Sequence, residues 1–172
     1  MLKSSKTLFF VVLVLLIFVY TQYYLKFNTS YRIIQAQLDK IDESVLYEKY
    51  PIVVADRIVK PEVLLQTLFK YKYITSSIEN RKGSINPYLV THKYTVLYNT
   101  MHDIDVNIIA PQYRGEFKTN VDFYRTQTQY VTIKLKKQQI IILPAFWLYH
   151  ITSPHTVIIL NDPFSYFISK IY

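Results

Sequence analysis

The chain of 172 residues lacks cysteine altogether and contains only two glycines. Without cysteine, disulfide bonds, thiolate catalysis and cysteine metal ligands are all excluded. With so little glycine, the sequence holds no glycine-rich loop of the kind that cradles phosphates, and it also lacks the Gly-x-Ser-x-Gly turn of many serine hydrolases. Nucleotide-dependent and hydrolytic chemistries therefore find no support in the sequence.

Charge is also sparse, because charged residues make up 19% of the chain and the formal net charge is +8. Basic and aromatic residues do not alternate in an RNA-binding signature, so we expect no nucleic-acid partner. Apolar residues dominate instead, at 51% hydrophobic and 16% aromatic. This content excludes a disordered chain and is sufficient for one folded domain.

The longest apolar run, Leu8 to Tyr20, has Lys3 and Lys6 before it and Lys26 after it. With the residues that follow it, about 18 helical residues at roughly 1.5 Å each nearly cross a hydrocarbon core of about 30 Å. A secretory signal peptide is the competing interpretation, but bulky aromatic residues occupy positions 20–27, where a cleavage site needs small ones. We therefore predict an uncleaved, single-pass membrane anchor.

The predicted anchor comprises residues 1–27, a short tail followed by the transmembrane helix. The side chains that we expect to contact lipid include Leu8, Phe9, Val12, Leu16 and Tyr20. This prediction places the protein in a membrane and makes the lipid bilayer its first partner.

Residues 28–50 are predicted to form an amphipathic helix. Ile34, Leu38, Ile41 and Val45 follow one another at spacings of four and three, which places them on one helical face. This apolar stripe fits either a helix packed on its own domain or a coiled-coil stalk through residues 30–50 that would form a homo-oligomer. Packing is favoured, because two heptads rarely hold an oligomer together.

Residues 51–172 are predicted to form a mainly β domain. Pro51 precedes a short buried strand, Pro61 begins a helix, and the polar stretch 75–87 is expected to be a loop. Further strands are expected at residues 94–98, 105–110, 131–135, 140–143 and 155–160. Successive strands without intervening helices favour antiparallel pairing in a sandwich or a partly closed barrel.

A resemblance to a known family lies in residues 135–151 and 157–161. An apolar strand rises to Pro144, Trp147 follows three residues later, and a histidine and a last strand come next. This arrangement resembles the closing strands of cupin-like and JmjC-like double-stranded β-helix domains. The resemblance implies an antiparallel jelly roll, here preceded by the transmembrane and amphipathic helices. It also implies a fold that often binds Fe(II) through two histidines and a carboxylate, with 2-oxoglutarate as co-substrate.

The sequence departs from the metal-binding pattern of this family. His102, Asp103 and Asp105 are suitable ligand types, but their spacing does not place two side chains on one strand face. Tyr149 stands where the family places a histidine ligand, and His150 follows one residue later. We therefore predict no metal and no cofactor. The alternative is an Fe(II) and 2-oxoglutarate site built from His102, Asp103 or Asp105, and His150.

Aromatic residues near the end of the chain are candidates for an apolar ligand pocket, although an ordinary core is the favoured interpretation. The pocket candidates are Tyr124, Tyr130, Phe146, Trp147, Tyr149 and His150. Abundant tyrosine, isoleucine and lysine with scarce glycine is similar to the composition of small membrane proteins from large double-stranded DNA viruses.

These features together predict a membrane-anchored, non-enzymatic structural or interaction protein with a degenerate cupin-like domain. A viral envelope or virion membrane is the expected setting, with other membrane or virion proteins as partners. Two alternatives stay open: a membrane-bound oxygenase dependent on Fe(II) and 2-oxoglutarate, and a lipid- or glycan-binding module.

Overall fold

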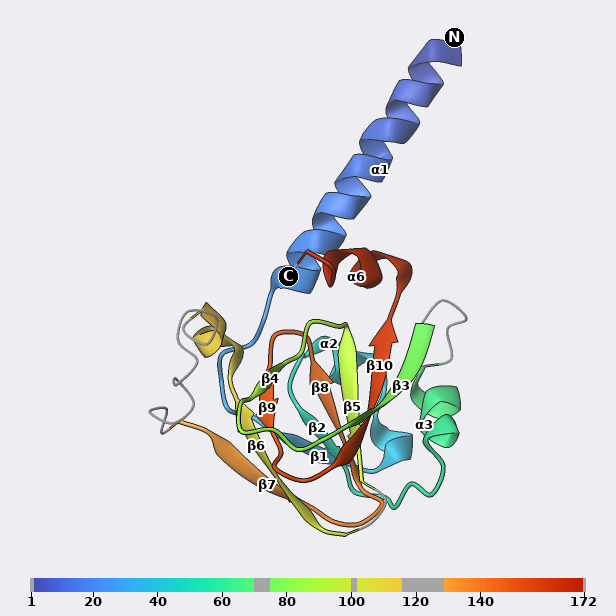
Figure 1. The fold of residues 1–172 in the computed structure, drawn as a ribbon. Coiled ribbons are helices and arrows are strands. Elements are labelled where there is room, and N and C mark those ends of the chain that lie inside the picture. The colour runs from blue at the N-terminus through green and yellow to red at the C-terminus, as the bar shows by residue number, and fades with distance from the viewer. Residues whose placement is uncertain (1, 70–74, 100–101, 116–128, 172) are drawn as a thin grey trace.

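A computed structural model describes residues 2–69, 75–99, 102–115 and 129–171. Its most conspicuous element is the helix α1 (Leu2–Leu25), which projects from a β domain (Figure 1). All twelve residues from Leu8 to Val19 are apolar and between 38% and 71% exposed. Residues 5–25, with a mean hydropathy of 2.3, are long and apolar enough to cross a membrane. The prediction of an N-terminal apolar helix is thus confirmed.

The β domain contains a six-stranded sheet in the order β1-β2-β8-β5-β10-β3. Its pairs are antiparallel, except that β1 and β2 run parallel. The strands of this sheet are β1 (Ile34–Ala36), β2 (Ile52–Val54), β8 (Ile140–Pro144), β5 (Tyr94–Tyr98), β10 (His155–Asn161) and β3 (Thr75–Arg81).

The second sheet has four antiparallel strands in the order β4-β9-β6-β7. They are β4 (Tyr88–Leu89), β9 (Leu148–His150), β6 (Ile104–Ile109) and β7 (Val131–Leu135). One apolar core joins both sheets and includes Leu97, Val106, Ile141, Trp147 and Val157. The coarse prediction of a two-sheet, largely antiparallel β domain is therefore confirmed.

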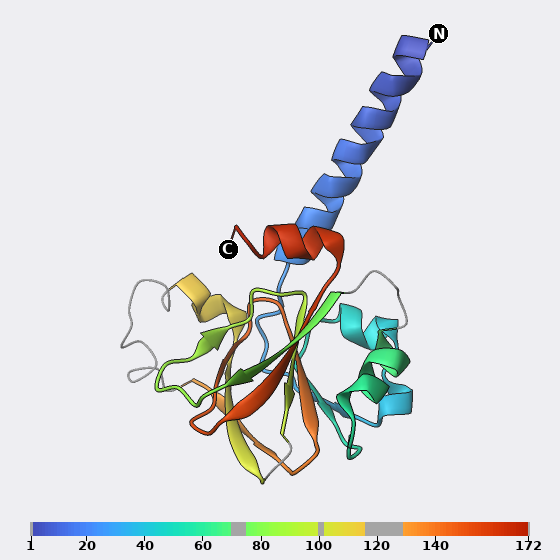
Figure 2. The same ribbon diagram turned by 45° about the vertical axis from the view of Figure 1, so that its right-hand side comes forward.

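Helices cover the other face of the six-stranded sheet. They are η1 (Leu38–Lys40), α2 (Glu43–Tyr47) and α3 (Pro61–Leu68), and Figure 2 shows them gathered on one side of the strands. A second core, which includes Leu46, Leu64, Val96, Ile142 and Ile158, lies beneath them. Because both faces of β5, β8 and β10 are buried, these strands carry apolar residues on both faces rather than alternating between apolar and polar ones.

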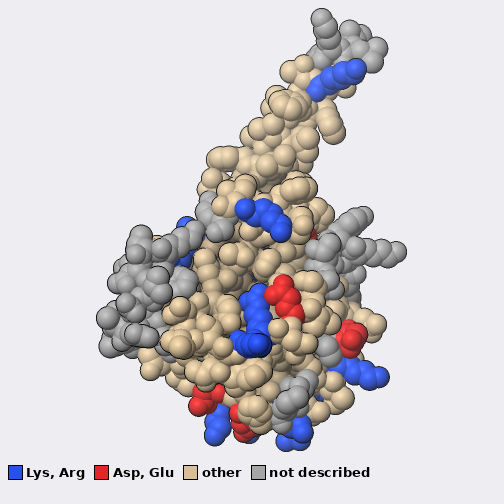
Figure 3. Space-filling view, viewed as in Figure 1, with Lys and Arg blue, Asp and Glu red and all other residues tan. Residues whose placement is uncertain are grey.

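Two further short helical elements of the described residues are η2 (Pro111–Tyr113) and α6 (Pro163–Ile168). In Figures 1 and 2, α6 lies across the base of α1, on the face of the domain from which α1 emerges. The space-filling view in Figure 3 shows α1 uncharged between its free end and the domain.

The amphipathic helix expected over residues 30–50 is not formed, and this prediction is wrong. Residues 34–36 form β1 instead, in register with residues 52–54 of β2, and only η1 and α2 are helical. The apolar stripe nevertheless has a physical basis, since Ile34, Leu38, Ile41 and Val45 all pack against the core beneath the helices. Their spacing therefore reflects a shared core rather than a helical period.

The loop expected over residues 75–87 is also partly wrong, because residues 75–81 form β3. This strand lies at the edge of the six-stranded sheet and pairs only with β10. Polar residues are tolerated, and indeed protective, on such an exposed edge. Their presence in β3 is what made the segment resemble a loop.

Candidate functional site

The last turn of α1 is packed into the domain, whereas the rest of the helix is exposed. Tyr24 is only 3% exposed and lies in a small apolar cluster with Ala145 and Phe146. Its ring meets that of Phe146 edge to face at 5.5 Å, and its hydroxyl donates to the carbonyl of Thr91 at 2.5 Å. The helix is therefore joined to the domain by side-chain contacts as well as by the chain itself.

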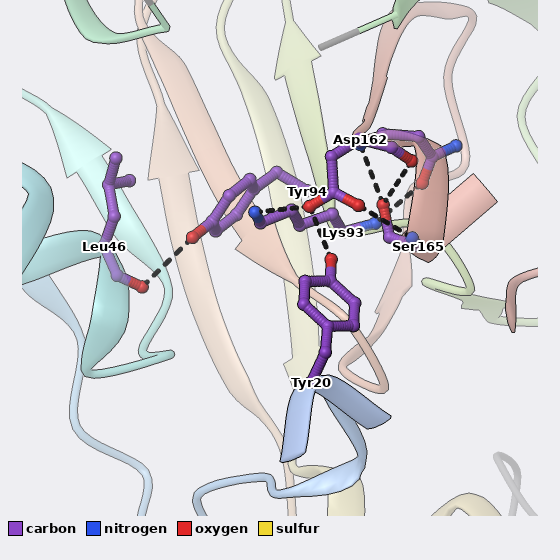
Figure 4. A network of polar contacts seen from close by, with 7 residues as sticks. Tyr20, Leu46, Lys93, Tyr94, Asp162 and Ser165 are labelled. Carbon is purple, nitrogen blue, oxygen red and sulfur yellow. Dashed lines mark hydrogen bonds and ion pairs between the residues drawn. The ribbon is translucent and has the colours of Figure 1, made fainter. Parts of the chain in front are cut away.

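Asp162 is the centre of a polar network at this junction (Figure 4). Its carboxylate accepts hydrogen bonds from the hydroxyl of Tyr20 on α1, from Lys93 Nζ at 2.7 Å and from the amide of Ser165 at 2.8 Å. Burial alone would raise the pKa of the Asp162 carboxyl, but these hydrogen bonds hold the pKa below its ordinary value. The ionised carboxylate thus ties α1, the residue before β5 and α6 together.

Ser165 and Asp162 also begin α6 as a capping box. The amide of Asp162 donates to Ser165 Oγ at 2.8 Å while the Asp162 side chain accepts from the Ser165 amide. Pro163 occupies the first helical position, where its missing N–H costs nothing. The sequence Asp-Pro-x-Ser is a helix-start signature that could have revealed α6.

Lys49 also contributes to the junction, because its side chain caps the C-terminus of α1. Its ammonium donates to the carbonyls of Tyr23, Tyr24 (3.2 Å) and Lys26 (2.7 Å), which matches three donors to three acceptors. The ammonium also lies 4.2 Å from the centre of the Tyr23 ring. The helix dipole places partial negative charge on these terminal carbonyls, which offsets part of the cost of burying the ammonium.

The backbone of Lys49 is held in the left-handed region, with φ at 56°, which is uncommon for a residue with a side chain. The indole of Trp147 donates to the Lys49 carbonyl at 3.2 Å and so links the cap to the core. No pattern in the sequence marks Lys49, because its three acceptors lie more than twenty residues away. Burial lowers the pKa of Lys49 to about 8, with the positive charges of Lys93 and Lys26 contributing.

This pKa predicts a pH dependence of stability. Between about pH 8 and the ordinary lysine value of 10.5, the unfolded chain binds the Lys49 proton and the folded chain does not. The contribution of Lys49 to the free energy of unfolding should therefore rise with pH from about 8 to 10. The stability of K49M relative to the parent chain should accordingly fall over this range, as measured by urea denaturation of the full chain in detergent. Exposed Lys134→Met is the matched control, and equal slopes in K49M and the parent chain would contradict the prediction.

The residues predicted to line a ligand pocket do not gather in one place. Phe146 lies at the junction, where the Arg114 guanidinium is 4.4 Å from its ring centre. Trp147 and Tyr149 are fully buried in the core between the sheets. His150, on β9, is 6% exposed and pairs with Asn107 on the neighbouring strand β6. Tyr130, finally, is 43% exposed, and Tyr124 lies outside the described residues.

The residues of the alternative iron site also lie apart. His150 is in register with Asn107 on β6, whereas Asp103 precedes the start of that strand. Four residues of strand separate the two positions, which is about 13 Å and too far for one metal ion. Within the described ranges no group of three His, Asp or Glu side chains could hold a metal. The arrangement of His102, Asp103 and His150 therefore does not fit Fe(II).

A second polar cluster lies at the far end of β3 and β10. The Arg81 guanidinium donates to the hydroxyl of Tyr149 at 2.8 Å and forms an ion pair with Glu79 at 2.7 Å. Tyr88 stacks on Tyr149 with ring centres 5.2 Å apart, and His155 meets both rings edge-on. A cavity of about 320 Å³ opens beside Arg81 and His155. Sequence reasoning missed Arg81 because it lies on the edge strand that was expected to be a loop.

A scan against models of known protein families finds no match to this chain, and a search of curated proteins finds no relative of it.

Proposed function

We propose that the chain is a single-pass membrane protein that holds a non-enzymatic interaction domain in a fixed orientation on one membrane surface. The observation that carries this proposal is the contrast within α1. Twelve consecutive exposed apolar residues precede a last turn that is built into the domain. A helix that is apolar on all sides is stable only when lipid or protein surrounds it.

The same contrast argues against a cleaved signal peptide. Cleavage near the end of the apolar run would remove Tyr20 and Tyr24. Asp162 would then lose one of its donors, and Phe146 would lose the ring that covers it. A segment that is destined for removal gains nothing from such contacts, so they support a permanent anchor.

The strand order supports a jelly roll of the cupin-like kind. Strands β3 to β10 divide into the groups β8-β5-β10-β3 and β4-β9-β6-β7, and successive strands alternate between the two groups except for the antiparallel pair β6 and β7. Chain-adjacent strands such as β3 and β4, or β4 and β5, thus lie in opposite sheets. That alternation is the pattern expected of a double-stranded β-helix, with β1 and β2 added at one edge.

The filling of the space between the sheets supports a non-enzymatic role. In the cupin-like family this space would hold the metal and co-substrate, but here Trp147, Tyr149 and aliphatic side chains occupy it. We therefore infer that the domain acts through its surface. Its partners would be the bilayer and other membrane proteins, and the composition of the chain supports a viral envelope or virion membrane as the setting.

Membrane flotation of the full chain tests the anchor. We expect the intact, uncleaved chain to float with vesicles after alkaline carbonate extraction. Val12→Arg with Leu13→Arg should abolish flotation, since each arginine at the centre of a span costs about 2.5 to 3.5 kcal/mol. Ile85→Arg, at a domain position that is 71% exposed, is the matched control. A soluble product, or one shortened after the apolar run, would refute the proposal.

A further inference from the structure

The helix α6 presents an apolar face to the outside of the molecule. Phe164 and Phe167 are 46% and 69% exposed, and their spacing of three residues places them on one side of α6. Ile171, in the turn that follows α6, is 80% exposed. Ser165, on the other side, is fully buried and forms the cap with Asp162. Large apolar side chains in one stripe mark a surface that meets an apolar partner.

This apolar face lies beside α1, at the point where α1 leaves the domain. The ring centres of Phe164 and Tyr20 are 5.2 Å apart, and the Tyr20 hydroxyl is bound to Asp162 immediately before α6. Both ribbon views show α6 running across the helix base rather than along it (Figures 1 and 2). The capping box and the Asp162 network hold α6 in this position.

The length of the uncharged part of α1 determines where the edge of the bilayer must lie. Tyr24 is buried in the domain and Tyr20 is bound to it, while Lys6 marks the charged end of the apolar stretch, so residues 7–20 are the uncharged part available to span lipid. At about 1.5 Å per residue this stretch covers roughly 21 Å, less than the hydrocarbon thickness of about 30 Å. The hydrocarbon edge must therefore reach the level of Tyr20, which is also the level of Phe164.

We propose that α6 is a second membrane contact, lying in the plane of the bilayer with Phe164, Phe167 and Ile171 inserted into the same leaflet that α1 enters. This inference rests on the proposed anchoring function. Lys170, whose ammonium lies 5.3 Å from the ring centre of Tyr166, is placed to meet the lipid headgroups. A short helix binds a bilayer weakly alone, but the tether supplies a high effective concentration.

The two contacts together would fix the orientation of the domain. With α1 alone, bending at its base would let the domain tilt over the membrane. A second apolar contact beside the first would restrict the domain to a single tilt relative to the membrane. The β4-β9-β6-β7 sheet and the cavity beside Arg81 would then stay at fixed distances from the bilayer. The partner of α6 is thus a lipid surface, and binding of a protein there is an outcome that the test must distinguish.

The absence of cysteine permits a direct test by single-cysteine labelling. The full chain carrying Phe167→Cys is labelled with the environment-sensitive dye NBD and reconstituted into phosphatidylcholine vesicles. We expect a blue-shifted emission and quenching by lipids brominated on their acyl chains. Ile85→Cys, which is similarly exposed at 71%, should show neither effect. Leu16→Cys in α1 reports separately on the anchor.

The three labels separate the two proposals. Lipid contact at residues 16 and 167, but not at 85, supports α6 as a membrane contact. Lipid contact at residue 16 with water at residue 167 overturns the inference about α6 and leaves the anchor intact. A blue shift at residue 167 without lipid quenching would indicate a protein partner, and it would also overturn the inference about α6. Water at all three positions refutes the anchor and the inference together.

Discussion

Replacement of Trp147 by alanine is expected to lower the free energy of unfolding by about 3 to 5 kcal/mol. The ring is 1% exposed in the core between the sheets, so its loss opens a cavity that rigid strands on both sides cannot fill. The substitution also removes the donor to the Lys49 carbonyl, which holds the cap of α1. Loosening of the helix base should therefore accompany the loss of stability.

Urea denaturation of the full chain in detergent, followed by far-ultraviolet circular dichroism, measures this effect without depending on tryptophan fluorescence. Trp147→Phe retains most of the packing but loses the hydrogen bond, and it should cost about 0.5 to 1.5 kcal/mol for that bond plus a smaller packing loss. Ile85→Ala, at an exposed position, should change stability by less than about 0.5 kcal/mol. A W147A chain as stable as the parent would show that the ring is not in the core.

Gly83→Ala is the second substitution for which we expect a large effect. A methyl group at Gly83 would overlap the backbone carbonyl of Thr152 and lie 2.8 Å from the amide nitrogen of Ser153. The two segments are held side by side, because the amide of Ser84 donates to the carbonyl of Ile151 at 3.0 Å. Overpacking typically costs about 1 to 3 kcal/mol, and a backbone that must move places this case at or above the upper end.

The second glycine of the chain is the matched control for this prediction. A methyl group at Gly115 meets no atom within 4 Å, so Gly115→Ala should leave the urea midpoint close to that of the parent. Equal midpoints for Gly83→Ala and Gly115→Ala would show that the close approach to Thr152 does not exist in solution.

Most central strands could be predicted from the sequence, whereas the edges of the fold could not. The strands predicted at residues 140–143 and 155–160 were identified because burial on both faces produces apolar runs rich in β-branched residues. At the edges this signal disappears. The polar strand β3 was predicted as a loop because residues 77–80 are all exposed, on both faces of the strand. The strand β1 was predicted as part of a helix because Ile34 and the apolar residues after it share one core. A pattern of apolar residues reports which side chains are buried. Burial in turn indicates the type of secondary structure only for the central strands of a sheet.

The junction at the base of α1 was out of reach for a different reason. The tyrosines at positions 20 and 24 were visible in the sequence as part of the bulky aromatic segment 20–27, but their partners Asp162 and Thr91 lie more than sixty residues away. The carbonyls that Lys49 caps are likewise distant in the chain. Such contacts depend on which strands become neighbours, and a single sequence carries no local signal for that.

The place of β10 in the sheet has a consequence for biosynthesis. This strand comes from residues 155–161, yet it lies in the interior of the sheet and pairs with β5 on one side and β3 on the other. While the ribosome is still adding these residues, β5 and β3 have no common partner and their apolar or unpaired edges are open. The helix α1, which we propose as the membrane anchor, is made before these strands. The domain can thus close only after residues 155–161 have been made, and a chain truncated before them would be an aggregation-prone fragment rather than a smaller working protein.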